Sequence, residues 1–207
     1  MIASLRRALV AVVVLAGCTH ARSSATALPT DADTPPMLVV VVRHAEKAPL
    51  PADDPVLSAA GIARAASLDS ALRRLPVTDV VVTHLQRTRL TAAAFIARTN
   101  AIVHVIPIAG GGIADHIAAI ADTVRAISQQ RGRGGVLVVG HSNTVTQIVA
   151  ALGGGENQPL CDSQYARLFV LKEQSSGIVL TERSTYGAPD PLDASCASGT
   201  AAVPPRR

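Results

Sequence analysis

Short, continuous runs of apolar, β-branched residues are the feature of this sequence that most constrains its fold. The clearest are Leu38 to Val42 (LVVVV) and Val136 to Val139 (VLVV), with Asp79 to Thr83 (DVVVT) as a third example. Such a run is typical of a strand that is buried on both faces, as in a parallel sheet covered by helices.

Helical periodicity separates these runs. Between Ser58 and Leu75 apolar residues recur near a period of 3.6, Ser58 can cap the helix, and Pro76 stops it. The same reading predicts further helices over 88–98, 113–130 and 143–152, and further strands over 101–106, 166–172 and 178–183. The last two strands are expected to pair as an antiparallel hairpin at the sheet edge. This alternation predicts an α/β fold with a mostly parallel central sheet and an antiparallel edge.

The N-terminus reads as a targeting segment. Arg6-Arg7 precede a short apolar stretch over 8–16, and Leu15-Ala16-Gly17-Cys18 resembles the lipobox of bacterial lipoproteins. We therefore expect a lipoprotein signal peptide over 1–17 and lipidation of Cys18, with the protein on the periplasmic side of the envelope. Thr19 at the next position favours the outer membrane. The alternative is an ordinary secretory signal that contains a chance cysteine.

Composition sets the remaining boundaries. Residues 18–36 are rich in small and polar residues and read as a flexible tether, 37–186 as the folded domain, and 187–207 as a flexible tail. Aromatic residues make up only 2% of the chain and the formal net charge is +4, of which two charges lie in the targeting segment. These features disfavour nucleic acid as a partner.

Cys161 and Cys196 remain after the expected cleavage. In an oxidising periplasm such a pair predicts a disulfide, with two free thiols as the alternative.

Cationic side chains follow three of the predicted strands. Arg43-His44 ends the first strand, His84 and Arg87 follow the second, and His141 follows the fourth. Ligands bind beyond the carboxyl ends of strands in sheets of this kind. Guanidinium groups match tetrahedral oxyanions, and imidazole can attack phosphorus as well as bind its oxygens. The sequence therefore predicts a phosphate site at this edge of the sheet.

Four motifs in this order resemble the histidine phosphatase (phosphoglycerate mutase-like) superfamily, branch 1. They are Arg43-His44-Ala45-Glu46, then LSAAGIARA over 57–65, LQRTRLTA over 85–92, and Gly140-His141-Ser142-Asn143. The resemblance implies a three-layer α/β/α sandwich and hydrolysis of phosphomonoesters through a phosphohistidine intermediate, without a metal or other cofactor. It implies His44 as nucleophile, Arg43 and Arg87 as ligands of the phosphoryl oxygens, and His141 as a group that stabilises the transition state. The expected partner is a small phosphorylated substrate.

The proton donor is not marked by a family-like glutamate. Asp115 is the only carboxylate that follows the third predicted strand closely, and it is predicted either as the donor or as a first-turn residue that favours the helix dipole. Glu46 is expected to orient substrate, and His84 either lines the pocket or faces solvent.

Three other functions remain to be compared. Gly140-His141-Ser142-Asn143-Thr144 imitates an esterase elbow, but position 144 is not glycine and no histidine follows Ser142. The histidines of the domain lack a metal-binding spacing. A lipoprotein that binds phosphorylated ligands without turning them over is the main alternative to the enzyme.

Overall fold

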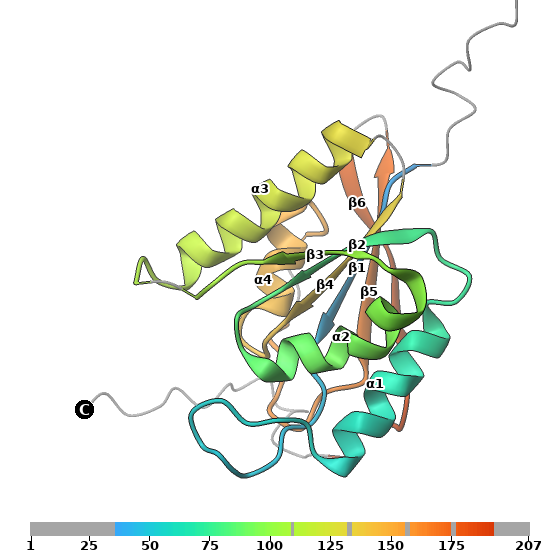
Figure 1. The fold of residues 1–207 in the computed structure, drawn as a ribbon. Coiled ribbons are helices and arrows are strands. Elements are labelled where there is room, and N and C mark those ends of the chain that lie inside the picture. Colours follow the sequence, from blue (N-terminus) through green and yellow to red (C-terminus); the bar gives the residue numbers. More distant parts are fainter. Residues whose placement is uncertain (1–35, 109, 132–133, 156–157, 175–176, 193–207) are drawn as a thin grey trace, which may run out of the picture. The chain divides into compact units, whose positions relative to one another are not determined.

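The computed structural model describes residues 36–108, 110–131, 134–155, 158–174 and 177–192 of the 207-residue chain. These residues form six strands and four helices, which alternate up to the final hairpin (Figure 1). The elements are β1 (Leu38–Arg43), α1 (Ala59–Ala71), β2 (Val77–Val82), α2 (Gln86–Thr99), β3 (Ile102–Val105), α3 (Ile113–Arg131), β4 (Gly135–Gly140), α4 (Val145–Ala151), β5 (Arg167–Gln174) and β6 (Gly177–Thr185).

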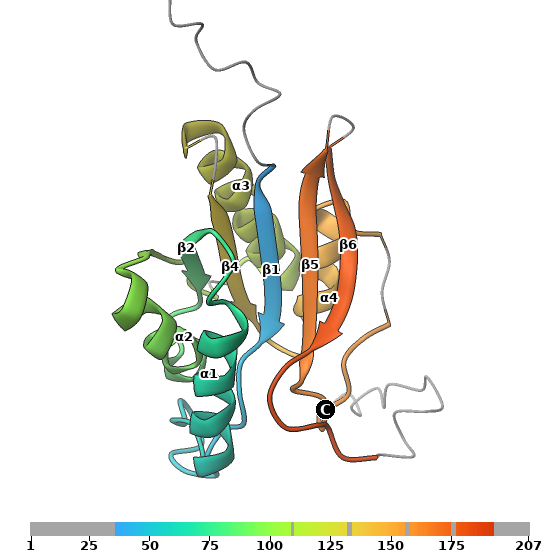
Figure 2. The same ribbon diagram turned by 90° about the vertical axis from the view of Figure 1, so that its right-hand side faces the viewer.

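The strands form one sheet in the order β3-β2-β4-β1-β5-β6. The first four strands of this order run parallel, whereas β5 pairs antiparallel with β1 and β6 pairs antiparallel with β5 (Figure 2). The predicted α/β fold, with its mostly parallel sheet and antiparallel edge, is confirmed. Because β1 lies beside β4 and β4 beside β2, the carboxyl ends of all three strands reach the same edge.

Side chains of the central strands alternate between two cores. Val39 and Val41 of β1 pack with α3 and α4 residues such as Ile120 and Ile148. Val40 and Val42 pack with α1 and α2 residues, including Leu68 and Phe95. The run LVVVV is thus buried on both faces, between the two helical layers.

Two boundaries differ from the prediction for physical reasons. α1 ends at Ala71 rather than Leu75, because Leu72 caps it and the chain then makes tight turns. Pro76 also disfavours a helical conformation of the residue before it. The predicted tail also begins with residues that contact the domain, since Ala188 O accepts from Arg64 and Asp190 accepts from the backbone of Tyr165 and Ala166.

The predicted signal peptide, Cys18, Cys196 and all but residue 36 of the predicted tether lie outside the described residues. Within the described ranges, no helix has both the length and the apolar character that a bilayer crossing requires.

Candidate active site

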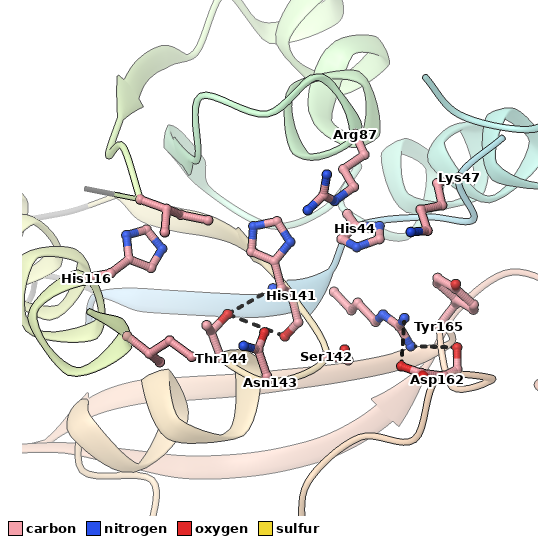
Figure 3. Close-up of a pocket in the computed structure, with 13 residues that line it drawn as sticks. His44, Lys47, Arg87, His116, His141, Ser142, Asn143, Thr144, Asp162 and Tyr165 are labelled. Atoms are coloured by element: carbon pink, nitrogen blue, oxygen red, sulfur yellow. Dashed lines mark hydrogen bonds and ion pairs between the residues drawn. The ribbon is translucent and has the colours of Figure 1, made fainter. Parts of the chain in front are cut away.

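A cavity of about 570 Å³ opens at the carboxyl ends of β1 and β4, beside the first turns of α2 and α3 (Figure 3). This volume suits a small organic ligand. Its lining is rich in basic groups and comprises Arg43, His44, Lys47, Arg87, Ile108, Ile113, His116, His141, Ser142, Asn143, Thr144, Asp162 and Tyr165.

His44 is held by backbone bonds on both sides. Its N–H donates to Gly140 O at 2.9 Å, which continues the pairing of β1 with β4. The next N–H, of Ala45, donates to Thr91 Oγ1 at 2.9 Å. The ring nitrogen Nδ1 lies 2.8 Å from Ala45 O, and because a carbonyl oxygen only accepts, Nδ1 must carry the proton. In the neutral ring the lone pair is therefore on Nε2, which is free for attack on a ligand.

His141 lies beside His44. The two ring centroids are 5.3 Å apart, with the rings inclined at 62°. The turn after β4 fixes His141, because its N–H donates to Thr144 Oγ1 at 2.9 Å. Nε2 of His141 is buried and has no hydrogen-bond partner within the described ranges.

The guanidinium group of Arg43 is held by hydrogen bonds at Nη1, whereas its Nε has no partner among the described residues. Its Nη1 donates to the carbonyl oxygens of Cys161, Asp162 and Gln164 at 2.9–3.0 Å. The guanidinium carbon lies 3.9 Å from the centroid of the Tyr165 ring. Nε is buried and, in the described part of the chain, unpaired. The group is thus held rigidly while a donor remains available.

Arg87 comes from the first turn of α2, where the helix dipole adds a positive potential. Asp54 Oδ1 accepts from the first backbone N–H of this turn, Gln86 N, at 2.8 Å. Thr91 connects this turn to the segment that carries His44, since its hydroxyl donates to Arg87 O at 2.7 Å while accepting from Ala45 N.

Burial and positive charge set the protonation of both histidines. Burial is the main cause that lowers the pKa of His44 to about 4, and the charges of Arg43 and Arg87 add to the effect. Burial, then His44 and Arg87, lowers the pKa of His141 to about 3. Both rings are therefore neutral near pH 7 before a ligand binds, as a nucleophilic imidazole must be. A bound dianion would favour the protonated form of His141.

Buried nitrogens without partners converge on this cavity. Among the described residues, four buried side-chain polar atoms lack a hydrogen-bond partner, and three of them belong to Arg43, His116 and His141. Buried polar atoms are normally paired, so a cluster of exceptions calls for a ligand that completes them. A tetrahedral oxyanion would supply acceptor oxygens for these nitrogens.

In the described part of the chain, no group of three or more His, Cys, Asp or Glu side chains is arranged to hold a metal ion.

Glu46 does not reach the cavity, which corrects its predicted role in substrate binding. Its carboxylate accepts from Nε and Nη2 of Arg64 at 2.8–3.0 Å. Arg64 also donates to Tyr186 O and Ala188 O. Glu46 therefore joins the segment after β1 to α1 and to the end of β6, as a structural ion pair.

Asp115 and His84 also lie outside the lining. Asp115 is exposed in the first turn of α3, and its carboxylate lies over Gly111. The structure therefore favours the helix-dipole alternative for this residue. His84 is exposed, and its Nδ1 accepts from the backbone N–H of Ile108 at 3.3 Å. It therefore contacts a residue of the cavity wall without lining the cavity itself.

Several lining residues, among them His116 and Tyr165, were given no chemical role by sequence reasoning. His116 lies one position after the residue that was considered as proton donor, and it is only 4% exposed. Tyr165, which stacks on Arg43, lies in a segment of irregular structure where no periodicity marks it. The segments 110–116 and 157–165 could be expected to form pocket walls from their place in the sequence, but no local pattern assigned a role to either residue.

Cys161 is disulfide-bonded. Because Cys196 lies outside the described residues, the pairing of these two cysteines stays a prediction.

Fold and cavity together define an α/β protein with a cavity rich in basic groups, which includes a histidine whose Nδ1 is held by a backbone carbonyl. Residues 39–111 match the model of the histidine phosphatase superfamily (branch 1). The match includes Arg43, His44 and Arg87 and ends before His116 and His141. No curated protein is similar enough in sequence to count as a match.

Solved structures add to this result. A candidate phosphohistidine phosphatase, SixA, from Nakamurella multipartitia is 25% identical, with a TM-score of 0.52 over 74% of this chain and 98% of its own. The protein histidine phosphatase SixA complexed with tungstate is 19% identical, with a TM-score of 0.56 over 72% and 97%. Phosphoserine phosphatase from Entamoeba histolytica, bound to 3-phosphoglyceric acid, is 14% identical, with a TM-score of 0.55 over 72% and 97%. The last two likenesses concern the fold. The family model thus matches a part of the chain, and the solved structures share its fold.

Proposed function

We propose that this protein hydrolyses phosphomonoesters of small substrates through a phosphohistidine intermediate on His44. One observation carries the proposal: a neutral imidazole, with its proton fixed on Nδ1 by Ala45 O, lines the same cavity as two arginines. Nε2 attacks phosphorus while Arg43 and Arg87 hold the phosphoryl oxygens, and water then releases phosphate from the ring. A protein with this fold, SixA, has been solved in complex with the oxyanion tungstate, which supports an oxyanion as the ligand.

Substrate size and charge follow from the cavity. About 570 Å³ accommodates a phosphoryl group with a compact leaving group, and Lys47 adds a cation at the exposed rim. Sugar phosphates, nucleotides and phosphorylated envelope glycans fit this description.

The test compares turnover of p-nitrophenyl phosphate by the wild type and by His44→Ala. We expect kcat/KM to fall more than about 10³-fold in the variant. A rapid quench with radiolabelled substrate should trap an acid-labile, base-stable phosphoryl group on the wild type and none on the variant. Turnover should persist in EDTA. Equal rates for the two proteins would instead favour a lipoprotein that binds phosphorylated ligands without hydrolysing them.

We further propose that the chain is anchored by lipid at Cys18 to the outer membrane, with the domain in the periplasm. Arg6-Arg7, the apolar stretch over 8–16 and the lipobox-like Leu15 to Cys18 support this location. Radiolabelled palmitate should enter the wild type, and Cys18→Ser should abolish labelling and release the protein from the membrane fraction. A labelled Cys18→Ser protein would contradict the anchor.

A further inference from the structure

His116 has the surroundings of a reacting group rather than those of a core residue. It lies in the first turn of α3 and lines the cavity with His44 and His141. Figure 3 shows His141 between His116 and His44, with the His116 ring turned toward the cavity. At 4% exposure, its ring is almost completely removed from bulk water.

The two ring nitrogens of His116 differ. Nδ1 lies 3.3 Å from Pro107 O, so this nitrogen carries a proton and donates it to the carbonyl. Nε2 is buried and has no partner within the described ranges. Leaving a buried nitrogen unpaired destabilises the fold, and a histidine with a purely structural role would normally have a partner for this atom. The Nδ1 bond also fixes the ring so that Nε2 is the atom available to a ligand.

Phosphomonoester hydrolysis needs a proton for the departing oxygen, and the cavity offers few donors. Asp162 is the only carboxylate in the lining, but its side chain is fully exposed and it lies beside Arg43, 3.9 Å from Nη2. Asp115 lies outside the lining. His141 lies directly beside the proposed nucleophile, with the two ring centroids 5.3 Å apart.

We propose that His116 is the proton donor to the leaving group, an inference that rests on the phosphatase function proposed above. As Nε2 of His44 bonds to phosphorus, the bond from phosphorus to the ester oxygen breaks. That oxygen takes the proton from Nε2 of the His116 imidazolium and departs as an alcohol. Water then attacks phosphorus and gives a proton to Nε2 of His116, while the phosphorus–nitrogen bond breaks and returns the lone pair to His44. Inorganic phosphate is released and both rings regain their starting states.

The charge of the substrate supplies the required protonation. In the free protein, burial first and the nearby His84 second lower the pKa of His116, while the bond to Pro107 O opposes them. A phosphate dianion in the cavity acts in the opposite direction and favours the imidazolium. Proton uptake is thus coupled to substrate binding.

The experiment compares two substrates in each variant: p-nitrophenyl phosphate, whose leaving group needs little protonation, and glycerol 3-phosphate, whose alkoxide needs a proton. In His116→Asn and His116→Gln we expect kcat/KM for glycerol 3-phosphate to fall about 10²–10³-fold, and for p-nitrophenyl phosphate less than about fivefold. Partial misfolding would lower both rates equally, so the ratio of the two within one variant isolates the chemical effect. Asp115→Asn and Asp162→Asn are matched controls and should keep the wild-type ratio.

Four outcomes would overturn the inference. Equal losses on the two substrates in both His116 variants would make His116 structural, and a selective loss in Asp115→Asn or Asp162→Asn would transfer the role to that carboxylate. A wild type that turns over neither substrate and forms no phosphohistidine would overturn the proposed function as well. Phosphohistidine formation with an unchanged substrate ratio in the His116 variants would overturn this inference alone.

Discussion

Arg43 and Arg64 are equally hidden, at 5% and 4% exposure, but they lie in opposite surroundings. Arg64, between α1 and the end of β6, has a carboxylate and two carbonyl oxygens around its guanidinium group. Arg43, at the end of β1, has carbonyl oxygens on Nη1 but a buried Nε without a partner in the described part of the chain. Arg64, Glu46 and the carbonyl groups of Tyr186 and Ala188 form a junction in which the guanidinium group finds its partners within the protein. In the cavity, by contrast, the buried Nε of Arg43 needs a ligand as its hydrogen-bond partner.

This difference separates stability from function. Buried polar groups that form hydrogen bonds with one another stabilise the fold. Buried polar groups whose partner is a ligand lower the stability of the ligand-free protein. Substitutions at the junction should therefore change the free energy of unfolding, and substitutions in the cavity should change turnover.

Arg87→Met tests the cavity side of this comparison. Removing one cationic donor from the phosphoryl oxygens should lower kcat/KM about 10²–10³-fold, equivalent to roughly 3–4 kcal/mol. The free energy of unfolding should stay constant or rise slightly, because a cation leaves the vicinity of Arg43 and His44. Phosphate at 100 times its Kd should stabilise the wild type by about 2.7 kcal/mol and the variant much less. A variant that loses stability and activity in parallel would contradict the comparison.

Arg64→Met is the matching change at the junction. Glu46, itself 23% exposed, would lose its partner, and Tyr186 O and Ala188 O would lose a donor. We expect the free energy of unfolding to fall by about 2–4 kcal/mol, less than for a fully buried pair because water reaches Glu46. Urea denaturation measures this loss, while kcat of the folded protein should remain within about threefold of the wild type. Arg64→Lys, which keeps the charge but not the bidentate geometry, should fall in between.

The sequence predicted the fold well because the fold depends on local patterns. Continuous apolar runs such as Leu38 to Val42 and Val136 to Val139 are readable without knowledge of their neighbours, and each became a strand buried on both faces. The predicted end of α1, at Leu75, lies four residues beyond the observed end at Ala71. The apolar spacing continues through the turns after Leu72, so the pattern alone does not mark where the helix ends.

The site was harder to predict, because its roles depend on distant partners. Glu46 follows His44 closely in sequence, but Arg64, 18 positions later, takes its carboxylate. Asp115 and His116 are adjacent in sequence, and the turn of α3 alone decides that His116 is buried at the cavity while Asp115 is exposed. Residue type predicted a chemistry for the site, and tertiary contacts determine which residues line the cavity.

Acidification should weaken the fold through the cavity rather than through the junction. The pKa of His44 is lowered to about 4 and that of His141 to about 3 in the folded protein, while the unfolded chain titrates near 6.5. The unfolded state therefore binds more protons below pH 6.5, and stability that is complete above this pH falls as the pH drops toward 4. Each such proton contributes a slope of up to about 1.4 kcal/mol per pH unit.

Urea midpoints between pH 7 and 4.5 measure this slope. His141→Phe removes one of the titrating rings and should give a shallower decline, whereas Arg64→Met should lower the whole curve with little change in its slope. Identical slopes in the wild type and His141→Phe would show that other groups control acid stability.

Gly61→Ala tests the segment that the cavity and the junction share. Alanine is favoured over glycine in a helix by about 1 kcal/mol, so an unobstructed substitution would stabilise α1. However, a Cβ atom at position 61 would meet the backbone oxygen of Glu46, two residues after His44. Because backbone must then move, we expect a net destabilisation of about 1–3 kcal/mol and a fall in kcat as the His44 segment shifts. Ala63→Gly, at an exposed position of the same helix, measures the propensity effect alone. A Gly61→Ala protein with higher stability and full activity would mean that the segment carrying Glu46 yields without disturbing His44, and that the two regions are independent at their point of contact.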